Sequence, residues 1–516
     1  MTPKADDRAA GAPPGGTARR LMVNTLHAAT GRIAALALWV VFTPLILRAI
    51  GRDGFAVWAL FYALTGYLFA LDFGLGQSAL RAAAAARETG DHAQAGSFAR
   101  IALLGYLALG ALWLVLGVTL RAPVLAWLRV PPALAADAGF AMWVGALVFV
   151  TGGAANVTIS LLQGYGRFDL ANRVLLTMTG AQAAGFALVL ARTGGLRGLV
   201  MVVAGASLLG CAAGVALLRA AAPGLRWRAH ADTRAHAGAV LRFGGPMQVT
   251  NLLATVHVQF DKLLISRFVA LAGVASYELG SRVAVMVSTF PQLLLLPVIP
   301  ESAAMHAAGQ DSRLRELYDR GNRFYLALAA LGIAGAVACA GRVYGVWLGA
   351  AQPEASLVLR GLAVAIGISL LTGMGTTIAK GVGRTELEMW YAVCSVGIHL
   401  GSSLLWVPRY GLHGAIGAIL IGNLCGSALF SWRFARLMGW PLGRVVLAPV
   451  VWPVLAAAVG ILAGLALDRA LPVGGGVAGW AALGAVGAAS VIGTATVVLL
   501  SRYVRVRDLR ALARRA

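Results

Sequence analysis

Apolar runs of about 20 residues recur along the whole chain, and they constrain its fold more than any other feature. An α-helix rises about 1.5 Å per residue, so about 20 apolar residues cross a hydrocarbon core about 30 Å thick. Of the 516 residues, 59% are hydrophobic and 12% are charged, whereas soluble domains have about 25% charged residues. The pattern predicts an all-α polytopic membrane protein with about 14 transmembrane helices. The expected spans are residues 31–50, 55–80, 98–120, 138–162, 173–191, 197–218, 243–267, 274–299, 323–342, 356–379, 389–407, 412–432, 445–467 and 477–500.

The basic residues are distributed unequally between the two ends of these spans. With the N-terminus inside, the cytoplasmic segments contain 29 Lys and Arg, the opposite segments contain 10, and four lie within spans. Cytoplasmic loops carry an excess of Lys and Arg, so both termini are expected in the cytoplasm. Residues 1–30 then form a disordered tail without a cleavable signal peptide, and residues 501–516 form a basic tail. Membrane topology and anionic lipid also account for the net charge of +23, so nucleic-acid binding is not expected.

Three short segments of the first half recur in the same order in the second half. Spans 1–6 therefore resemble spans 7–12, and an even number of spans per repeat predicts two halves that insert in the same sense. Transporters are often built in this way, although a duplication without transport is the alternative. We expect an N-lobe at 31–220, a C-lobe at 241–436 and two further helices at 445–500. The matching pairs, at offsets of 216 to 219 residues, are 54–60 with 273–279, 164–170 with 381–387, and 195–198 with 411–414.

The seventh and eighth spans contain the densest set of polar residues within apolar runs. His257 and Asp261 are one helical turn apart, and Asn251, Gln259 and Lys262 belong to an adjacent stripe. A charge at membrane depth costs about 2.5–3.5 kcal/mol on insertion scales, so such residues are functional candidates. No loop between spans is long enough for a soluble catalytic domain.

Three stretches carry a resemblance to a known family. They are PLILRAIGRDGFAVWALFYALTGYLFALDFGLGQSALR (44–81), FDKLLISRFVALAGVASYELGSRV (260–283) and YGLHGAIGAILIGNL (410–424). Together with the order of the spans over about 31–500, they resemble the polysaccharide-flippase branch of the multidrug/oligosaccharidyl-lipid/polysaccharide (MOP) superfamily. The resemblance specifies the superfamily better than the substrate.

This resemblance implies two helical lobes around a cavity and a transporter rather than an enzyme. The implied activity is movement of an undecaprenyl-diphosphate-linked oligosaccharide from the inner to the outer leaflet of a bacterial inner membrane. Glycan-polymerising and chain-length proteins are then expected as partners, and an ion gradient, of protons or Na⁺, is expected to drive the cycle. Three alternatives remain open: a multidrug or cation antiporter, a lipid II flippase, and a membrane glycosyltransferase or polymerase.

The polar residues of the seventh and eighth spans allow two interpretations. In the first, these residues form a cavity wall that binds the substrate, with Lys262 attracting the diphosphate, and Asp261 with His257 takes part in ion coupling. The wall residues are Asn251, Gln259, Lys262 and Arg282. In the second, Asp261 forms a structural ion pair with Lys262 or with Arg282, which lies at a similar depth in the next span.

In the first half, Asp72 lies past the middle of the second span and is followed by Gly74 and Gly76. A break in the helix there would expose backbone carbonyls to a cavity, with Asp72 as a second ion-coupling candidate. A close helix crossing permitted by the glycines is the alternative. Arg32 and Arg81 lie near cytoplasmic helix ends, where they either bind a diphosphate or reach the lipid headgroups.

Two cytoplasmic loops share the pattern Gly-x-Gly-Arg. We interpret them as hinge loops for the rocking of the lobes, with Asp169 and Glu386 as caps of the following helices. Their residues are Gly164, Gly166 and Arg167 in the first half, and Gly381, Gly383 and Arg384 in the second.

The remaining polar residues and motifs carry little functional signal. His399 and Arg360 are expected to make ordinary core contacts. The HxxxxD pattern of His306 and Asp311 has no supporting acyltransferase motif. The GxGxxG pattern of Gly474, Gly476 and Gly479 follows no strand and so does not predict a nucleotide site, and no metal-ligand spacing is present. No cofactor or metal is therefore expected.

Overall fold

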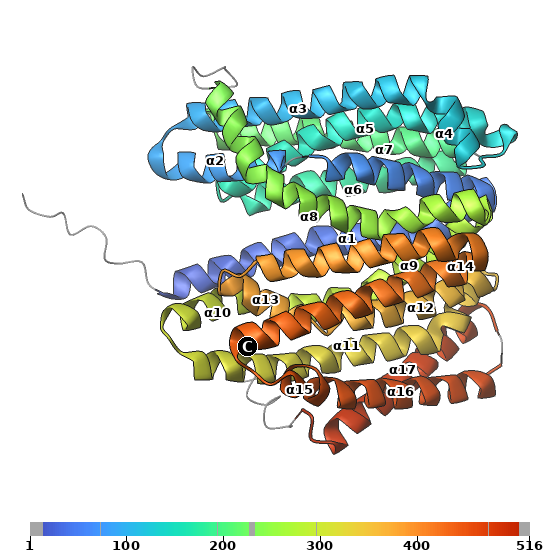
Figure 1. Cartoon of the computed structure of the whole chain (residues 1–516). Helices are drawn as coiled ribbons and strands as arrows, with labels where there is room; N and C mark the ends of the chain where they lie inside the picture. The colour runs from blue at the N-terminus through green and yellow to red at the C-terminus, as the bar shows by residue number, and fades with distance from the viewer. Residues whose placement is uncertain are drawn as a thin grey trace, which may run out of the picture. The chain divides into compact units, whose positions relative to one another are not determined.

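The computed structural model describes residues 14–72, 74–192, 194–225, 233–295, 297–472 and 474–504, without the side chains of 14–30, 32, 33, 233–250 and 293. The described residues are helical throughout, with turns and short links between helices and no β-strand (Figure 1). The protein is therefore an all-α polytopic membrane protein, as the apolar runs predict. The helices are α1 Pro14–Ala70, α2 Leu75–Thr89, α3 His92–Thr119, α4 Arg121–Trp127, α5 Pro132–Gly164, α6 Phe168–Ala191, α7 Leu196–Ala221, α8 Thr233–Phe268, α9 Leu271–Leu293, α10 Val298–Ala307, α11 Asp311–Leu348, α12 Pro353–Leu370, α13 Gly373–Gly381, α14 Glu386–Met438, α15 Leu442–Val445, α16 Leu447–Ala470 and α17 Gly476–Leu500.

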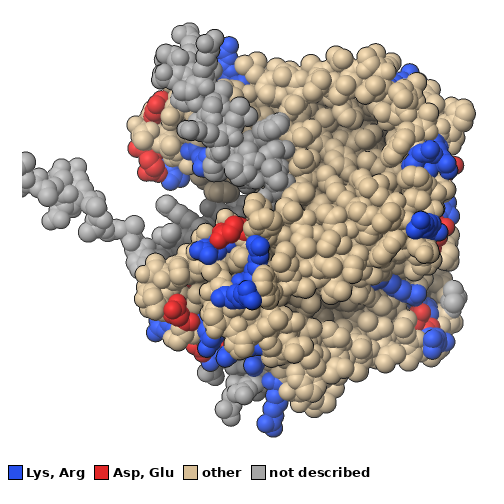
Figure 2. Space-filling model, viewed as in Figure 1, with Lys and Arg blue, Asp and Glu red and all other residues tan. Residues whose placement is uncertain are grey.

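Within the described residues, 10 helical segments are long and apolar enough to cross a membrane. Two of them contain two predicted spans each, because α1 turns at Gly51 (φ 68°) and α14 turns at Gly411 (φ 57°). Both turns use a left-handed φ that is favourable only for glycine. α8 and α9, which carry the charged residues, supply the other two predicted spans. Figure 2 shows that charged side chains on the visible face gather at helix ends and leave the middles of the helices uncharged.

Two predicted spans are interrupted. The second span, expected to run unbroken over 55–80, stops at Ala70 and resumes as α2 at Leu75. The tenth, expected at 356–379, is divided into α12 and α13 around Leu371 and Thr372. Each break lies beside a glycine, Gly74 (φ 68°) in the first and Gly373 in the second, and glycine weakens a helix by about 1 kcal/mol relative to alanine.

The chain forms two compact units. Unit 1 comprises Met1–Leu125 and Pro131–Val249, and unit 2 comprises Ala126–Val130 and Thr250–Ala516. In unit 1, α5 packs against α2, α3 and α7, around a core that includes Tyr106, Phe149 and Leu161. The lobe limits expected from the sequence stay predictions.

In unit 2, α11 packs against α12 and against the C-terminal pair α16 and α17. Arg342 of α11 binds the end of α16: its guanidinium lies 2.6 Å from the Asp468 carboxylate and donates to the carbonyl oxygens of Leu471 and Pro472. These carbonyls lie at the C-terminal end of α16, where a cation is favourable for the helix dipole.

The internal repeat is visible in matching local packing. In unit 1, a Cβ added to Gly153 would lie 2.3 Å from the Tyr106 ring, and in unit 2 a Cβ added to Gly373 would lie 2.2 Å from the Tyr325 hydroxyl. Tyr106 and Tyr325 are 219 residues apart, and the glycines are 220 apart. Each unit thus places a buried tyrosine against a glycine of the facing helix, which is a close approach that a larger residue would prevent.

Candidate functional site: a buried acid and imidazole cluster in unit 2

Asp261 of α8 is fully buried and surrounded by hydrogen-bond donors. The hydroxyl of Tyr277, on α9, donates to Oδ2 at 2.6 Å, and the hydroxyl of Ser403, on α14, donates to Oδ1 at 2.9 Å. His399 Nε2, also on α14, lies 3.1 Å from both carboxylate oxygens. A buried carboxylate is costly unless it is hydrogen-bonded or paired, and two helices, α9 and α14, supply these partners.

A second histidine extends this cluster. His257 Nδ1 lies 3.2 Å from His399 Nδ1, and the two ring centroids are 4.8 Å apart. A hydrogen bond between two imidazole nitrogens requires that one carries the proton and the other accepts it. His257, His399 and Asp261 therefore form a continuous hydrogen-bonded chain, in which His399 bridges the other two.

This chain begins at a cavity of about 360 Å³ within unit 2. His257 and Tyr277 contribute to its wall, whereas Asp261 does not. Glu388 lines the same cavity and pairs with Lys380 at 2.9 Å. The other lining residues are Ala254, Val258, Ser281, Val285, Leu362, Ile366, Ser369, Tyr391, Ala392, Ser395, Val396, Ile419 and Asn423.

An ion-paired triad lies next to Asp261 along α8 and α9. Lys262 Nζ lies 2.5 Å from Glu278 Oε2, and Arg282 Nε lies 2.5 Å from Glu278 Oε1. Lys262 also donates to Gln259 Oε1 at 2.6 Å. Lys262 and Glu278 are buried, while the Arg282 side chain is 38% exposed. Two cations share one carboxylate, so the triad carries one net positive charge.

These contacts correct the expected pairing. Asp261 was expected to pair with Lys262 or with Arg282, but both of these cations pair with Glu278 instead. His399, expected to make an ordinary core contact, is instead the imidazole partner of Asp261. Glu278 was missed, although its position four residues before Arg282 is the spacing of a helical ion pair.

The corresponding place in unit 1 is aromatic. Residues 45–48 (LILR) align with 264–267 (LISR) at the offset of 219. At that offset Phe42 corresponds to Asp261 and Trp58 to Tyr277, and at an offset of 217 Phe186 corresponds to Ser403. The centroid of the Phe186 ring lies 5.6 Å from that of the Phe42 ring and 5.9 Å from that of the Trp58 ring.

The triad has no counterpart in unit 1 either. At the same offset of 219, Thr43, Ala59 and Ala63 take the positions of Lys262, Glu278 and Arg282, and all three are buried. Unit 1 packs this region without charged groups.

Unit 1 has its own smaller polar cluster at the break after α1. Asp72 accepts a hydrogen bond from the Gly74 backbone N–H at 2.8 Å and another from the Tyr106 hydroxyl at 3.2 Å. Asn156 donates to that hydroxyl at 3.4 Å. The helix breaks at this point, as one interpretation of the sequence predicted. The close crossing of the other interpretation is also present between α2 and α5, because a Cβ on Gly76 would lie 2.9 Å from the Asn156 amide nitrogen.

The two Gly-x-Gly-Arg loops adopt the same turn. The Arg167 N–H donates to the Leu162 carbonyl and the Arg384 N–H to the Ala379 carbonyl, each at 2.8 Å. Gly166 (φ 76°) and Gly383 (φ 79°) take the left-handed position of this helix-ending Schellman motif. The hinge role stays a prediction.

The acidic residues of these loops are not helix caps. Asp169 pairs with Arg167 at 3.0 Å, and Glu386 pairs with Arg384 at 2.8 Å. The N-cap positions belong instead to Arg167 and Thr385, and neither makes a side-chain capping bond. The expectation that Asp169 and Glu386 cap the helices is therefore wrong.

The other predicted site residues lie apart from these clusters. Arg81, on α2, and Asn251, on α8, are exposed. The side chain of Arg32 lies outside the described residues. Gly164 and Gly381 are sites of close approach: a Cβ would lie 2.4 Å from the Leu80 carbonyl oxygen in the first case and 2.8 Å from that of Ile299 in the second.

Comparison with known proteins defines the class first. The helical fold matches an inward-facing multidrug resistance MATE family transporter of the MOP superfamily, with a TM-score of 0.65, 17% identity and coverage of 78% of this chain and 94% of that one. It also matches the lipid II flippase MurJ in an inward closed conformation (TM-score 0.67, 11% identity, 92% and 98% coverage). The bent form of the Vibrio cholerae MATE transporter VcmN is similar too (TM-score 0.56, 18% identity, 82% and 98% coverage). The protein thus has the MOP-superfamily fold.

The sequence family is more specific. Residues 21–303, more than half of the chain, match the family described as polysaccharide biosynthesis protein. The chain belongs to this family. No curated protein sequence matches it.

Proposed function

We propose that this protein moves an undecaprenyl-diphosphate-linked oligosaccharide from the inner to the outer leaflet of a bacterial inner membrane by alternating access. Membership of a polysaccharide biosynthesis family and a fold shared with a lipid II flippase support this proposal. The polyprenyl tail stays in lipid while the diphosphate and sugars pass between the lobes. Both termini lie in the cytoplasm, and glycan-polymerising and chain-length proteins act on the product.

One observation carries the proposal of active transport: the acid and imidazole cluster of unit 2 occupies the position where unit 1 packs Phe42, Trp58 and Phe186. The aromatic version shows that this part of the repeat folds without buried charge. Buried polar clusters are expensive to maintain and are concentrated where membrane proteins move ions or substrates. We therefore assign the cluster to coupling rather than to stability.

The coupling ion in this proposal is the proton. Both Asp261 oxygens already accept hydrogen bonds, and two imidazole rings connect the carboxylate to the cavity. Imidazole changes its protonation state near neutral pH and can pass a proton between its two nitrogens. His257 would take a proton from the cavity, His399 would transfer it, and Asp261 would hold it. Asp72, in unit 1, is a second candidate.

Arg282 is the residue that we assign to the diphosphate. Lys262 is buried against Glu278, so its charge is committed to that carboxylate, whereas Arg282 is partly exposed. A guanidinium matches phosphate geometry and can donate to it while retaining a second contact. Lys262, on the other oxygen of Glu278, then makes the net charge of the triad positive. Gln259 accepts a hydrogen bond from the Lys262 ammonium and orients it.

Antiport of a drug or cation is the second candidate. The cavity beside His257 has a mainly apolar wall, and Glu388 is its one acidic lining residue among those described. Such a cavity suits an amphipathic cation. A lipid II flippase would differ from the main proposal only in the sugar carried.

The test is the leaflet distribution of lipid-linked glycan in a deletion strain complemented with variants. Inner-leaflet glycan should accumulate in the deletion strain. Wild type and the control Asp137→Asn, which changes a partly exposed acid paired with Arg197 in unit 1, should restore export. Asp261→Asn and Arg282→Ala should not. Normal outer-leaflet glycan in the deletion strain, with altered resistance to cationic dyes, would contradict the flippase and favour the antiporter.

A further inference from the structure

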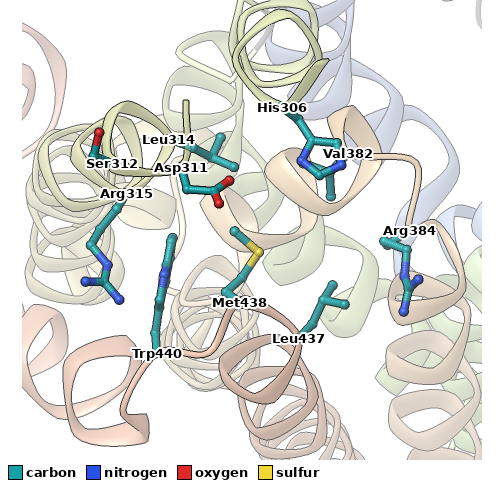
Figure 3. A pocket seen from close by; sticks show the side chains of 10 residues that line it. All are labelled: His306, Asp311, Ser312, Leu314, Arg315, Val382, Arg384, Leu437, Met438 and Trp440. Atoms are coloured by element: carbon teal, nitrogen blue, oxygen red, sulfur yellow. The ribbon is translucent and has the colours of Figure 1, made fainter. Parts of the chain in front are cut away.

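A second pocket lies at one end of the unit 2 helices, away from the Asp261 cluster. It has a volume of about 690 Å³ and is formed by the end of α10, the start of α11, the turn after α13, and the end of α14 with Trp440 just beyond it (Figure 3). His306 and Arg384 line one side, and Leu437 and Met438 supply an apolar part of the wall. The Lys and Arg count of the sequence predicts that this end of the helices faces the cytoplasm.

The first turn of α11 contributes a carboxylate and a guanidinium to this pocket. Asp311 and Arg315 are four residues apart, a spacing at which such side chains usually pair. Among the described residues neither forms an ion pair. The Arg315 guanidinium lies 5.4 Å from the centroid of the Trp440 ring instead. Figure 3 shows Arg315 alongside Trp440, with the Asp311 carboxylate directed elsewhere in the pocket.

Packing keeps the Trp440 ring in this position. The ring is 8% exposed, with its centroid 5.1 Å from Tyr318 and 5.7 Å from Phe434. A cation over a tryptophan face is attracted by the negative charge of the ring face. The arrangement therefore holds a positive and a negative group apart in one pocket, and both remain available to a ligand.

The repeat shows that the fold does not require this pocket. At an offset of 219, His92 corresponds to Asp311, and at 217 Tyr165 corresponds to Val382. In unit 1 the His92 Nδ1 and the Tyr165 hydroxyl lie 3.1 Å apart, so two rings occupy the place. Gly96 corresponds to Arg315 at an offset of 219, and Gly224 corresponds to Trp440 at an offset of 216. Unit 2 replaces this ring pair with an acid, a base and an aromatic wall.

Neighbouring tryptophans place the pocket at the level of lipid headgroups. The Arg433 guanidinium lies 4.8 Å from the centroid of the Trp390 ring, and the Arg436 guanidinium lies 4.3 Å from that of the Trp432 ring. Trp390 is near the start of α14 and Trp432 is near its end. Both tryptophans are exposed. Exposed tryptophan and arginine at helix ends are typical of the membrane–water interface.

We infer that this pocket binds a zwitterionic phospholipid headgroup, phosphoethanolamine, with the ammonium on Asp311 and the phosphate on Arg315. The two ligand charges are separated by a short ethyl chain, and the pocket presents opposite charges on one helical turn. A primary ammonium donates hydrogen bonds to a carboxylate, which a choline headgroup cannot do. A glycerol headgroup supplies the phosphate but no cation.

The experiment measures lipid adducts on the purified, delipidated full-length protein by native mass spectrometry. Phosphatidylethanolamine, phosphatidylcholine and phosphatidylglycerol with identical acyl chains are titrated separately. For wild type we expect the ethanolamine lipid to bind about fivefold more tightly than the other two, which corresponds to about 1 kcal/mol. Asp311→Asn should abolish this preference, and Arg315→Ala should weaken the binding of all three lipids, because each carries a phosphate.

Arg313→Ala is the matched control, because Arg313 is an exposed residue of the same turn that does not line the pocket. It should bind all three lipids as wild type does. Equal binding of the three lipids by wild type, or the same preference in Asp311→Asn as in the control, would overturn the inference. Competition by soluble phosphoethanolamine at the concentration of the lipid would overturn the lipid source and assign the pocket to a free phosphate ester.

Discussion

The two units place different chemistry at the same position of one repeat. Unit 1 packs Phe42 and Trp58 against Phe186, while unit 2 places Asp261 and Tyr277 next to Ser403. Rings stabilise a helix packing by burial and by edge contacts worth about 0.5–1.5 kcal/mol. A buried acid must instead find donors and contributes little net stability. The comparison separates what the fold needs, which is a filled volume, from what unit 2 adds, which is a buried, hydrogen-bonded carboxylate.

Among the single substitutions, the largest effect on stability is expected for Glu278→Ala. This change leaves Lys262 buried without its carboxylate, and removing one partner of a buried pair typically costs about 3–5 kcal/mol. We expect a large fall in the thermal unfolding midpoint of the purified protein. Glu386→Ala breaks an exposed pair with Arg384 and should change the midpoint little, since such pairs contribute about 0–1 kcal/mol. Similar falls for both variants would contradict the buried triad.

Replacing the cluster of unit 2 by its unit 1 counterpart is the sharpest test of the comparison. The variant combines Asp261→Phe, Tyr277→Trp, His399→Gln and Ser403→Phe, following Phe42, Trp58, Gln182 and Phe186. Overpacking costs about 1–3 kcal/mol per site, so the variant should fold with a lowered unfolding midpoint and lose export.

Two measurements are read together for this variant: the midpoint, and the leaflet distribution of lipid-linked glycan. A folded variant that still exports glycan would show that the buried acid is dispensable. It would return the cluster to a structural role.

A smaller effect is expected at the break in unit 1. Tyr106→Phe removes the hydroxyl that donates to Asp72 and leaves the aromatic packing in place. Loss of one such hydrogen bond costs about 1–3 kcal/mol when a charged acceptor is left partly buried. Tyr325→Phe is the matched control in unit 2, because no hydrogen bond of the Tyr325 hydroxyl is observed among the described residues. If both variants unfold at the same temperature, the Asp72 contact contributes nothing measurable.

The smallest and most symmetric effect is expected at the two helix-ending turns. Gly166→Ala and Gly383→Ala each force a side chain into left-handed backbone, at a cost of about 1–2 kcal/mol. The two falls in unfolding midpoint should be nearly equal, because both turns have the same hydrogen bonds. Unequal falls would show that the repeat does not extend to the energetics of these loops.

Much of the fold could be predicted from short patterns. Runs of apolar residues identify the helices, and the glycines of GYGRFDL and GVGRTEL mark equivalent turns. The breaks at 71–74 and 371–372 were harder to place, since glycine is frequent throughout this chain. A helix can continue through a glycine when its neighbours pack well, so the break depends on contacts that the local sequence does not contain.

The candidate site could be predicted only in part. His257, Asp261, Lys262 and Arg282 stand out because charge is rare within apolar runs. Their partners do not stand out in the same way. His399 lies 138 residues from Asp261, and Ser403 is one hydroxyl among many.

The sequence by itself determined that this is an all-α polytopic membrane protein, where most of its spans lie, that its two halves are duplicated, and that costly charges lie in the second half. These follow from composition and periodicity, which act along the chain. Only the tertiary structure decided which charge meets which partner, because that depends on the rotation of α8, α9 and α14 about their axes. A rotation of one residue, 100°, would direct Asp261 to other neighbours. The assignment of Asp261 to His399, and of Glu278 to Lys262 and Arg282, therefore belongs to the packed helices.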